Sequence, residues 1–258
     1  MFYKKDVIMS KSKYILIYIR TIKGGKMMEK KLSIVMPVYN EKDLILDVLK
    51  KVNEIKIDGV DIEIIVVDDC STDGTREILK EEASKYANKV LYHEVNQGKG
   101  AALKTGFSEI TGNIAIVQDA DFEYDPMEIP SVIKPIIDGE ADVVYGSRFL
   151  DSEYKGYKQN QLANKILTGL SNLMTGLKVT DMETCYKAFK REFIQGITIK
   201  SNRFDFEPEI TAKIMKKKAR LKEVPISYNG RAHSEGKKIN WKYGIHAILT
   251  LIKYRFID

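Results

Sequence analysis

Residues 32–41, LSIVMPVYNE, open the regular part of the chain and decide its fold class. Leu32–Met36 form an almost continuous apolar run that ends at Pro37, a pattern typical of a short strand buried on both faces. Beyond it, Asn40 is a candidate helix N-cap, and apolar residues then recur at the spacing of one helix face. These residues are Leu44, Ile45, Val48, Leu49, Val52 and Ile55.

The same succession of strand and helix recurs through the first half of the chain. The predicted strands are Ile62–Val67, Val90–His93, Ile114–Gln118 and Asp142–Tyr145, and the predicted helices are residues 74–87, Lys99–Ile110 and Met127–Asp138. Buried strands that alternate with helices form a mainly parallel sheet with right-handed crossovers. The sequence therefore predicts an α/β fold with a mainly parallel sheet flanked by helices.

The pattern changes after residue 150. Helices are predicted at Asn160–Thr175, Glu207–Lys218 and Trp241–Tyr254, with short strands at Cys185–Phe189 and Val224–Ser227. No internal repeat or linker divides the chain, so we predict a single domain over residues 29–258, with halves at 29–150 and 151–258. Residues 1–28 hold seven Lys or Arg and one acid, and we predict a disordered basic extension there, with Met27 or Met28 as alternative starts.

The bulk composition narrows the class of protein. The 258 residues are 44% hydrophobic and 30% charged, which is ordinary for a water-soluble domain with one core. A net charge of +6 suits a polyanionic ligand, an anionic membrane or a nucleic acid without choosing among them. Two cysteines and three histidines argue against a zinc site or a disulfide framework and favour a reducing compartment. No apolar run approaches the roughly 20 residues of a membrane-spanning helix.

Carboxylates follow three of the predicted strands where each strand ends. Glu41 follows the first strand, the pair Asp68 and Asp69 follows the second, and Asp119 and Asp121 follow the fourth. In open parallel sheets this edge binds ligands, so the sequence crowds like charges at the expected ligand site. A bound cation would relieve that crowding.

The segment Asp119-Ala120-Asp121-Phe122-Glu123 is the candidate metal site. In extended backbone alternate side chains point the same way, so Asp119 and Asp121 can share one ion and Glu123 continues the parity. Oxygen ligands suit Mg²⁺ or Mn²⁺, which keep places for water and phosphate oxygens. The alternative is that these acids are solvated loop residues or helix N-caps, which is the simpler interpretation of Asp73.

The segment Gly98-Lys99-Gly100 opens a predicted helix, where backbone N–H groups favour a phosphate. It lacks the upstream glycine and the following Ser or Thr of a P-loop. We interpret the glycines as room for a tight connection between strand and helix, and we keep Lys99 as a candidate phosphate contact.

Seven motifs occur in order along the chain. They are PVYNE (37–41), VVDDCSTDGT (66–75), NQGKGAAL (96–103), QDADFEYDP (118–126), YGSR (145–148), DMETCYKAF (181–189) and EVPISYNGRAHSEGKKI (223–239). The first five together resemble family 2 glycosyltransferases of the GT-A fold. The last two resemble the branch of polyprenyl-phosphate hexosyltransferases that includes dolichol-phosphate mannose synthase. The resemblance covers residues 31–240.

The resemblance implies a nucleotide-sugar half at residues 29–150, an acceptor half at 151–258, and a role for each matched residue. Asp119 and Asp121 would be the metal–diphosphate pair, and Glu123 stands where mannose synthases commonly have Gln. The resemblance implies that Pro37, Tyr39, Glu41 and Asp69 line the nucleotide pocket. We add four candidate nucleotide-site residues that follow predicted strands or open a predicted helix: Asp68, Lys99, Asp119 and Ala120. The candidate catalytic residues are Asp121, Arg148, Arg231 and Lys237.

Two acceptor classes stay open. A lipid phosphate is already anionic and needs only placement and cations, supplied by Arg148, Lys187, Arg231, Lys237 and Lys238, and attack from behind would invert the anomeric carbon. A sugar hydroxyl would need a carboxylate base, Asp181 or Glu183. The basic segment 231–238 favours the lipid phosphate, although a merely solvated loop is the alternative for it.

The expected partners are a nucleotide-diphosphate sugar (GDP-mannose, UDP-glucose or UDP-N-acetylglucosamine), a lipid phosphate and the cytoplasmic membrane surface, where the protein would be peripheral. A nucleotidyltransferase would need a glycine-rich basic segment where PVYNE stands, and no RNA-stacking motif indicates nucleic acid. Six cations in Lys213–Lys222 indicate a solvated helix end. An apolar stripe near the C-terminus indicates a helix at a membrane interface or, alternatively, one packed on the core. The stripe consists of Trp241, Ile245, Ile248, Leu249, Ile252 and Phe256.

Overall fold

The computed structural model describes residues 30–150, 154–231 and 241–257, with the backbone alone for 241–243. The chain divides into Met1–Lys30 and Lys31–Asp258, and the account below concerns the second unit. The extension predicted at 1–28, and the predicted catalytic Lys237 with its neighbour Lys238, lie outside the described residues.

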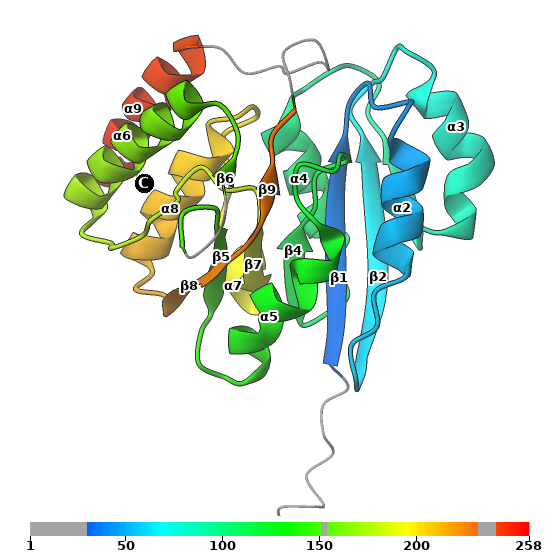
Figure 1. Ribbon diagram of the computed structural model, residues 1–258, viewed down its shortest axis with the longest axis horizontal. Coiled ribbons are helices and arrows are strands. Elements are labelled where there is room, and N and C mark those ends of the chain that lie inside the picture. Colours follow the sequence, from blue (N-terminus) through cyan, green and yellow to red (C-terminus); the bar gives the residue numbers. More distant parts are fainter. Residues whose placement is uncertain (1–29, 151–153, 232–240, 258) are drawn as a thin grey trace, which may run out of the picture. The chain divides into compact units, whose positions relative to one another are not determined.

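A seven-stranded sheet forms the centre of the fold (Figure 1). Its strands are β1 (Lys30–Val38), β2 (Val60–Asp68), β3 (Lys89–Tyr92), β4 (Ile114–Val117), β5 (Val143–Ser147), β7 (Lys187–Lys190) and β8 (Leu221–Pro225). They lie in the order β3-β2-β1-β4-β7-β5-β8. The pairs β1–β4, β2–β3 and β5–β8 are parallel, whereas β7 is antiparallel to both β4 and β5. The predicted α/β class is confirmed, with one inserted antiparallel strand.

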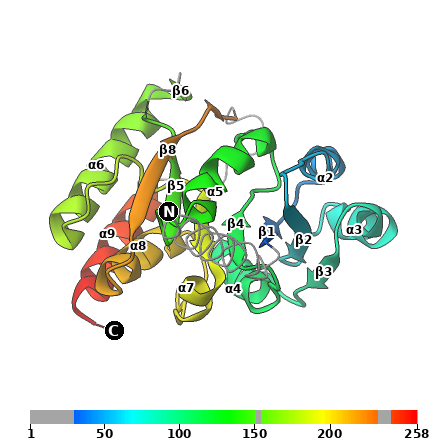
Figure 2. The same cartoon turned by 90° about the horizontal axis from the view of Figure 1, so that it is seen from below.

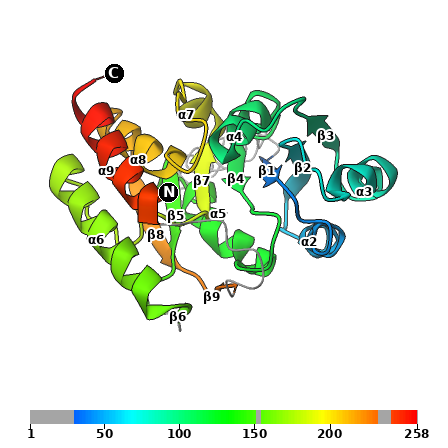
Figure 3. The same cartoon turned by 90° about the horizontal axis from the view of Figure 1, so that it is seen from above.

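Helices cover both faces of the sheet (Figures 2 and 3). They are α2 (Ile45–Asn53), α3 (Thr75–Glu82), α4 (Lys99–Ser108), α5 (Ile129–Ile137), α6 (Lys158–Thr175), α7 (Arg191–Gln195), α8 (Phe206–Lys216) and α9 (Trp241–Phe256), with short 3₁₀ turns at Ala83–Lys85 and Pro126–Glu128. Helices α2 and α5 lie on one face, and α4 and α7 lie on the other. Helices α6, α8 and α9 pack together beside the β5–β8 side of the sheet.

The core follows the predicted apolar pattern. In β1, Leu32 and Ile34–Met36 are fully buried, as expected for a central strand covered on both faces. The predicted face of α2 is buried as well, but the helix begins at Ile45 and Asn40 does not cap it. Asn40 has a positive φ of 54°, and its side-chain oxygen accepts a hydrogen bond from the Thr72 N–H at 2.8 Å. It therefore joins the loops that follow β1 and β2.

A two-stranded parallel sheet, β6 (Tyr154–Lys155) with β9 (Tyr228–Asn229), joins the segments that follow β5 and β8. Two residues are too few for a strand periodicity, so the sequence could not predict it. Strand β1 lies between β2 and β4, where the strand order reverses and where such sheets bind ligands. Within the described ranges no helix is both long and apolar enough to cross a membrane.

Candidate active site

Arg231, two residues after the end of β9, lies among three carboxylates from the opposite half of the sheet. Its Nη1 lies 2.9 Å from Glu41 Oε2, in the loop after β1, and its Nη2 lies 2.6 Å from Asp121 Oδ2, after β4. Its backbone N–H donates to Glu123 Oε1 at 3.0 Å. The structure thus brings four of the predicted site residues together, from positions up to 190 residues apart.

Asp121 is 7% exposed. The negative charges of Asp119 and Glu123 act on it, and the positive charge of Arg231 opposes them only in part. Burial, together with the charge of Asp119, raises the pKa of Asp121 to about 7 even though Arg231 opposes the rise. A carboxylate that ionises with such difficulty is stabilised by added positive charge. The arrangement therefore suits a site that receives a further cation.

Asp119 pairs with Lys99, the first residue of α4. Lys99 Nζ lies 2.8 Å from Asp119 Oδ1 and 3.6 Å from Glu207 Oε1. Burial disfavours the Lys99 ammonium, but the charges of Asp119 and Glu207 outweigh burial and hold the pKa of Lys99 well above its usual value. The predicted phosphate contact is therefore in the site, but here its partner is Asp119, the first aspartate of the predicted metal–diphosphate pair.

The glycines on either side of Lys99 have a second role beside the tight connection between strand and helix that was predicted. A Cβ on Gly98 would lie 2.5 Å from the carbonyl oxygen of Asn202, and one on Gly100 would lie 2.5 Å from that of Ser201. Gly98 also has a φ of 99°, which side chains rarely tolerate. These glycines make room for the segment that leads into α8, a contact that the local sequence does not reveal.

The three predicted metal ligands do not form one group. Glu123 is engaged elsewhere, because its Oε2 accepts from the Tyr228 hydroxyl at 3.0 Å and its Oε1 accepts from the Arg231 backbone. Among the described residues no group of three or more His, Cys, Asp or Glu side chains could hold a metal ion. The pair Asp119 and Asp121 remains, and two carboxylates completed by phosphate oxygens and water are a set that Mg²⁺ or Mn²⁺ accepts.

Asp69, predicted to line the nucleotide pocket, fastens the loop between β3 and α4. Its Oδ1 accepts from the Gln97 N–H at 2.9 Å and lies 2.7 Å from His93 Nδ1, while its Oδ2 accepts from the Gly98 N–H at 2.6 Å. Both oxygens of the Asp69 carboxylate thus have hydrogen-bond partners within the chain, and these contacts position the Gly98–Lys99 segment.

The other predicted nucleotide-site residues lie at the same edge with different exposure. Asp68 is fully buried and accepts from Arg76 Nε at 2.6 Å, so it too supports the loops. Pro37 and Tyr39, at the end of β1, are half-buried, and Ala120 is buried. Whether they contact a nucleotide stays a prediction.

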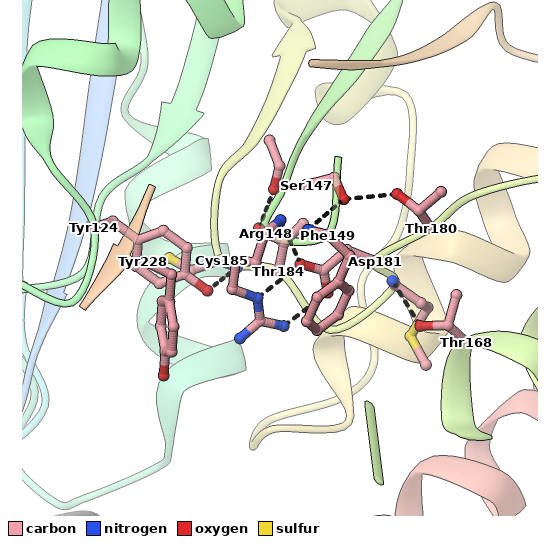
Figure 4. A network of polar contacts seen from close by, with 12 residues as sticks. Tyr124, Ser147, Arg148, Phe149, Thr168, Thr180, Asp181, Thr184, Cys185 and Tyr228 are labelled. Carbon is pink, nitrogen blue, oxygen red and sulfur yellow. Dashed lines mark hydrogen bonds and ion pairs between the residues drawn. The ribbon is translucent and has the colours of Figure 1, made fainter. Parts of the chain in front are cut away.

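Arg148, at the end of β5, is held by Asp181 in a two-pronged ion pair (Figure 4). The Nε–Oδ2 and Nη2–Oδ1 distances are both 2.7 Å, and the Arg148 backbone N–H donates to the same carboxylate at 3.0 Å. The rings of Phe149 and Tyr228 lie 5.6 and 5.1 Å from the guanidinium carbon. Asp181 is therefore a fixed counter-ion, which makes it a poor general base.

Glu183 and Lys187 lie beside this pair. Lys187, expected among the acceptor cations, is instead fully buried and donates to the carbonyl oxygens of Met182 (2.8 Å) and Thr184. It holds the loop that carries Glu183. Burial, with the charge of Glu207, raises the pKa of Glu183 to about 7, and Glu183 Oε1 has no hydrogen-bond partner among the described residues. Such a carboxyl has the pKa that a general base needs near neutral pH.

Sequence reasoning missed Glu207 and Tyr228. An acid in the first turn of a helix normally complements the helix dipole, so nothing local marked Glu207 as a partner of Lys99. Tyr228 stands inside a quoted motif, but only the pairing of β9 with β6, far apart in the sequence, brings its hydroxyl to Glu123.

Acids and cations gathered at the switch point of a mainly parallel α/β sheet are typical of enzymes that bind nucleotide phosphates. The family model Glycosyl transferase family 2 matches residues 33–198, and the chain belongs to that family of glycosyltransferases. The assignment sets aside the nucleotidyltransferase alternative.

Two curated relatives and one solved structure show the extent of the similarity. The chain is 30% identical over 211 residues to a dolichol-phosphate mannosyltransferase of Pyrococcus furiosus, over 80% of this chain and 59% of the relative. It is 29% identical over 248 residues to a UDP-N-acetylglucosamine–dolichyl-phosphate N-acetylglucosaminyltransferase of Methanococcus voltae, over 88% of this chain and 96% of the relative.

Glucosyl-3-phosphoglycerate synthase from Mycobacterium tuberculosis, solved with Mn²⁺, UDP and phosphoglyceric acid, has a similar fold, with a TM-score of 0.68 at 23% identity over 93% of this chain and 82% of that one. The predicted GT-A-like fold is confirmed.

Proposed function

We propose that the protein is an inverting, metal-dependent hexosyltransferase that moves a hexose from a nucleotide-diphosphate sugar to a polyprenyl or dolichyl phosphate. The observation that carries the proposal is the contact of Arg231 with Glu41 and Asp121, because it joins the start of the basic segment to the carboxylates expected at the donor. Both curated relatives described above are named for transfer to a dolichyl phosphate, which supports the acceptor class.

In this proposal Asp119 and Asp121 hold the divalent ion, which when bound offsets charge on the departing diphosphate. Lys99 keeps Asp119 in place, and Tyr228 with Glu123 keeps the backbone of Arg231 in place. An acceptor phosphate oxygen is already anionic, so the protein has only to place it behind the anomeric carbon. Arg231, and Arg148 held by Asp181, supply positive charge for phosphate oxygens, and Lys237 is proposed to join them.

We also propose peripheral contact with the cytoplasmic face of the membrane, through the outer surface of α6 and α9. These helices pack side by side and expose apolar residues at helical spacing (Figure 3). We name this surface the α6–α9 face, and its residues are Leu162, Ile166, Leu173, Ile245, Leu249, Ile252 and Phe256.

The charges on the two helices support that contact. Neither helix contains an Asp or Glu, while Lys158, Lys165, Lys253 and Arg255 are exposed. Apolar side chains bordered by cations suit an anionic lipid surface. The core-facing side of α9 carries Ala247, Leu251 and Tyr254, so the alternative that the predicted stripe packs on the core is wrong for its exposed members.

A second candidate function, transfer to a sugar hydroxyl, is favoured by Glu183. Its carboxyl has a pKa of about 7 and an oxygen without a hydrogen-bond partner in the described part of the chain. Asp181, the other predicted base, is committed to Arg148. Glu183 is therefore the one residue of that alternative which we retain.

Release of free nucleoside diphosphate tests the proposal. The full chain is incubated with Mn²⁺ and each of GDP-mannose, UDP-glucose and UDP-N-acetylglucosamine, with or without undecaprenyl phosphate. We expect one donor to release its diphosphate only when the lipid phosphate is present, and chelator to stop the release. Release that depends on a sugar alcohol and ignores the lipid phosphate would favour the hydroxyl acceptor.

A further inference from the structure

Each aspartate of the metal–diphosphate pair already has a cation of its own. Asp119 has Lys99 at 2.8 Å, and Asp121 has Arg231 at 2.6 Å. We infer that Arg231 is the resident counter-cation of the donor site, and that its contact with Asp121 opens when a divalent ion binds there. The inference rests on the proposed function, because it takes the Asp119–Asp121 pair as the metal site.

The two cations are anchored differently. Lys99 is fixed at the first position of a ten-residue helix, and its ammonium lies between Asp119 and Glu207, 3.6 Å away. Arg231 follows a strand of only two residues and reaches the acids with the end of a long side chain. Of the two ion pairs, the one between Arg231 and Asp121 is therefore the one that can exchange.

The present contacts of Arg231 leave one donor unused. Its Nη1 and Nη2 reach carboxylates, but its Nε is buried without a hydrogen-bond partner in the described part of the chain. A buried guanidinium N–H normally has an acceptor. Rotation of the guanidinium away from Asp121 would let Nε find an acceptor. Two oxygens of a phosphate can accept from a guanidinium in the bidentate geometry that Arg prefers.

Two consequences follow for the order of binding. While Arg231 donates to Asp121 Oδ2, that oxygen cannot serve a divalent ion without repulsion between the two cations. Once Arg231 has moved, its charge is available to an acceptor phosphate. Donor binding and phosphate binding are then coupled through one side chain, and by linkage each favours the other.

The experiment titrates Mn²⁺ alone into the full chain and follows the electron paramagnetic resonance signal of the free ion. Arg231→Ala removes the competitor, so we expect it to bind Mn²⁺ about tenfold tighter than the wild type, the factor that one charge-assisted hydrogen bond provides. Arg231→Lys keeps the charge and should fall between them. Arg220→Ala is the matched control, since Arg220 pairs with Asp142 at the amino end of β5 and should leave Mn²⁺ binding unchanged.

Thermal unfolding provides a second readout that does not depend on turnover. Without Mn²⁺, Arg231→Ala should melt below the wild type, because Glu41 and Asp121 lose their cation; with Mn²⁺ its melting temperature should rise by more than that of the wild type. Equal or weaker Mn²⁺ binding by Arg231→Ala overturns the inference and leaves the proposed function standing. If neither protein binds Mn²⁺ at the Asp119–Asp121 pair, both are overturned. Arg231→Gln repeats the titration should the Ala variant unfold.

Discussion

Asp181 accepts two hydrogen bonds from the guanidinium of Arg148, both at 2.7 Å, and neither side chain is more than 7% exposed. The pair joins the end of β5 to the loop that carries Glu183. Since buried charges cost free energy unless paired, the loss of either partner leaves the other uncompensated.

Asp181→Asn should therefore lower the free energy of unfolding by about 3–5 kcal/mol, the usual effect of breaking a buried ion pair. The exposed pair between Glu140 and Lys222 provides the comparison, and Glu140→Gln should cost only about 0–1 kcal/mol. Urea unfolding of both variants measures the difference. Similar losses in the two would mean that the Arg148–Asp181 pair contributes no more than a surface contact.

The raised pKa of Glu183 predicts a pH dependence of stability. With a folded pKa of about 7, against an ordinary value near 4.5, the carboxyl binds its proton more tightly in the folded state. Its contribution to stability is complete below the ordinary value and is lost as the pH rises through about 7. Glu183→Gln should remove this loss, so the variant should gain on the wild type between about pH 4.5 and 7, by at most about 1.4 kcal/mol per pH unit. Thermal unfolding across that range measures it, and parallel pH profiles would contradict the raised pKa.

The same variant separates the two candidate acceptors. A lipid phosphate needs no general base, so Glu183→Gln should retain most transfer to undecaprenyl phosphate. A hydroxyl acceptor needs a base, and transfer to it should then fall about 10²- to 10⁴-fold. Diphosphate release with each acceptor distinguishes them, and loss of lipid transfer would make Glu183 part of the lipid-phosphate reaction as well.

How much of this site the sequence could predict depended on how far apart in the sequence the contacting residues lie. Parallel strands bring their carboxyl ends to one edge, so the sequence indicated that Glu41 and Asp121 belong to one region. The family resemblance added Arg231, and its contacts with both carboxylates agree with that placement. It could not show that Glu123 would be taken by Tyr228, because that contact joins residues 105 positions apart through the two-residue strand β9. Lys187 was misjudged for a similar reason: β7 runs antiparallel, and its first residue enters the core.

Local sequence signals likewise predicted the helices and strands better than the loops that connect them. The apolar stripe of α2 was visible in the sequence, but Asn40 looked like its N-cap because Asn is common at both helix starts and left-handed turns. Gly98 and Gly100 showed only that space was needed there, and the segment that fills the space comes from Ser201 and Asn202.

The metal hypothesis predicts the effect of neutralising the aspartate pair. Asp119→Asn and Asp121→Asn should each abolish Mn²⁺ binding and transfer while the fold is kept, because a carboxamide is a weaker ligand and relieves the crowding of charge. Asp125→Asn, whose side chain accepts from the Met127 N–H at the start of a 3₁₀ turn, is the control and should retain Mn²⁺ binding. Mn²⁺ titration and diphosphate release check both effects. Full activity of the wild type in excess chelator would contradict metal dependence.

The last prediction concerns the α6–α9 face. Removal of residues 241–258 cannot test it cleanly, because Leu251 and Tyr254 of α9 are buried and their loss would expose the core. Single substitutions of exposed residues avoid this problem. Ile166→Glu and Leu249→Glu introduce an acid at positions 55% and 57% exposed, so the free energy of unfolding should change little.

Binding of these variants to vesicles rich in phosphatidylglycerol should fall at least about tenfold, since each loses apolar contact and gains repulsion from anionic lipid. Val95→Glu, at an exposed apolar position outside the α6–α9 face, should sediment with vesicles like the wild type. Transfer to a short, water-soluble isoprenyl phosphate should persist in the α6 and α9 variants, while transfer to long-chain acceptors in vesicles falls. If both variants still sediment like the wild type, the membrane contact lies elsewhere; if they change only the oligomeric state, the face binds a second copy of the chain.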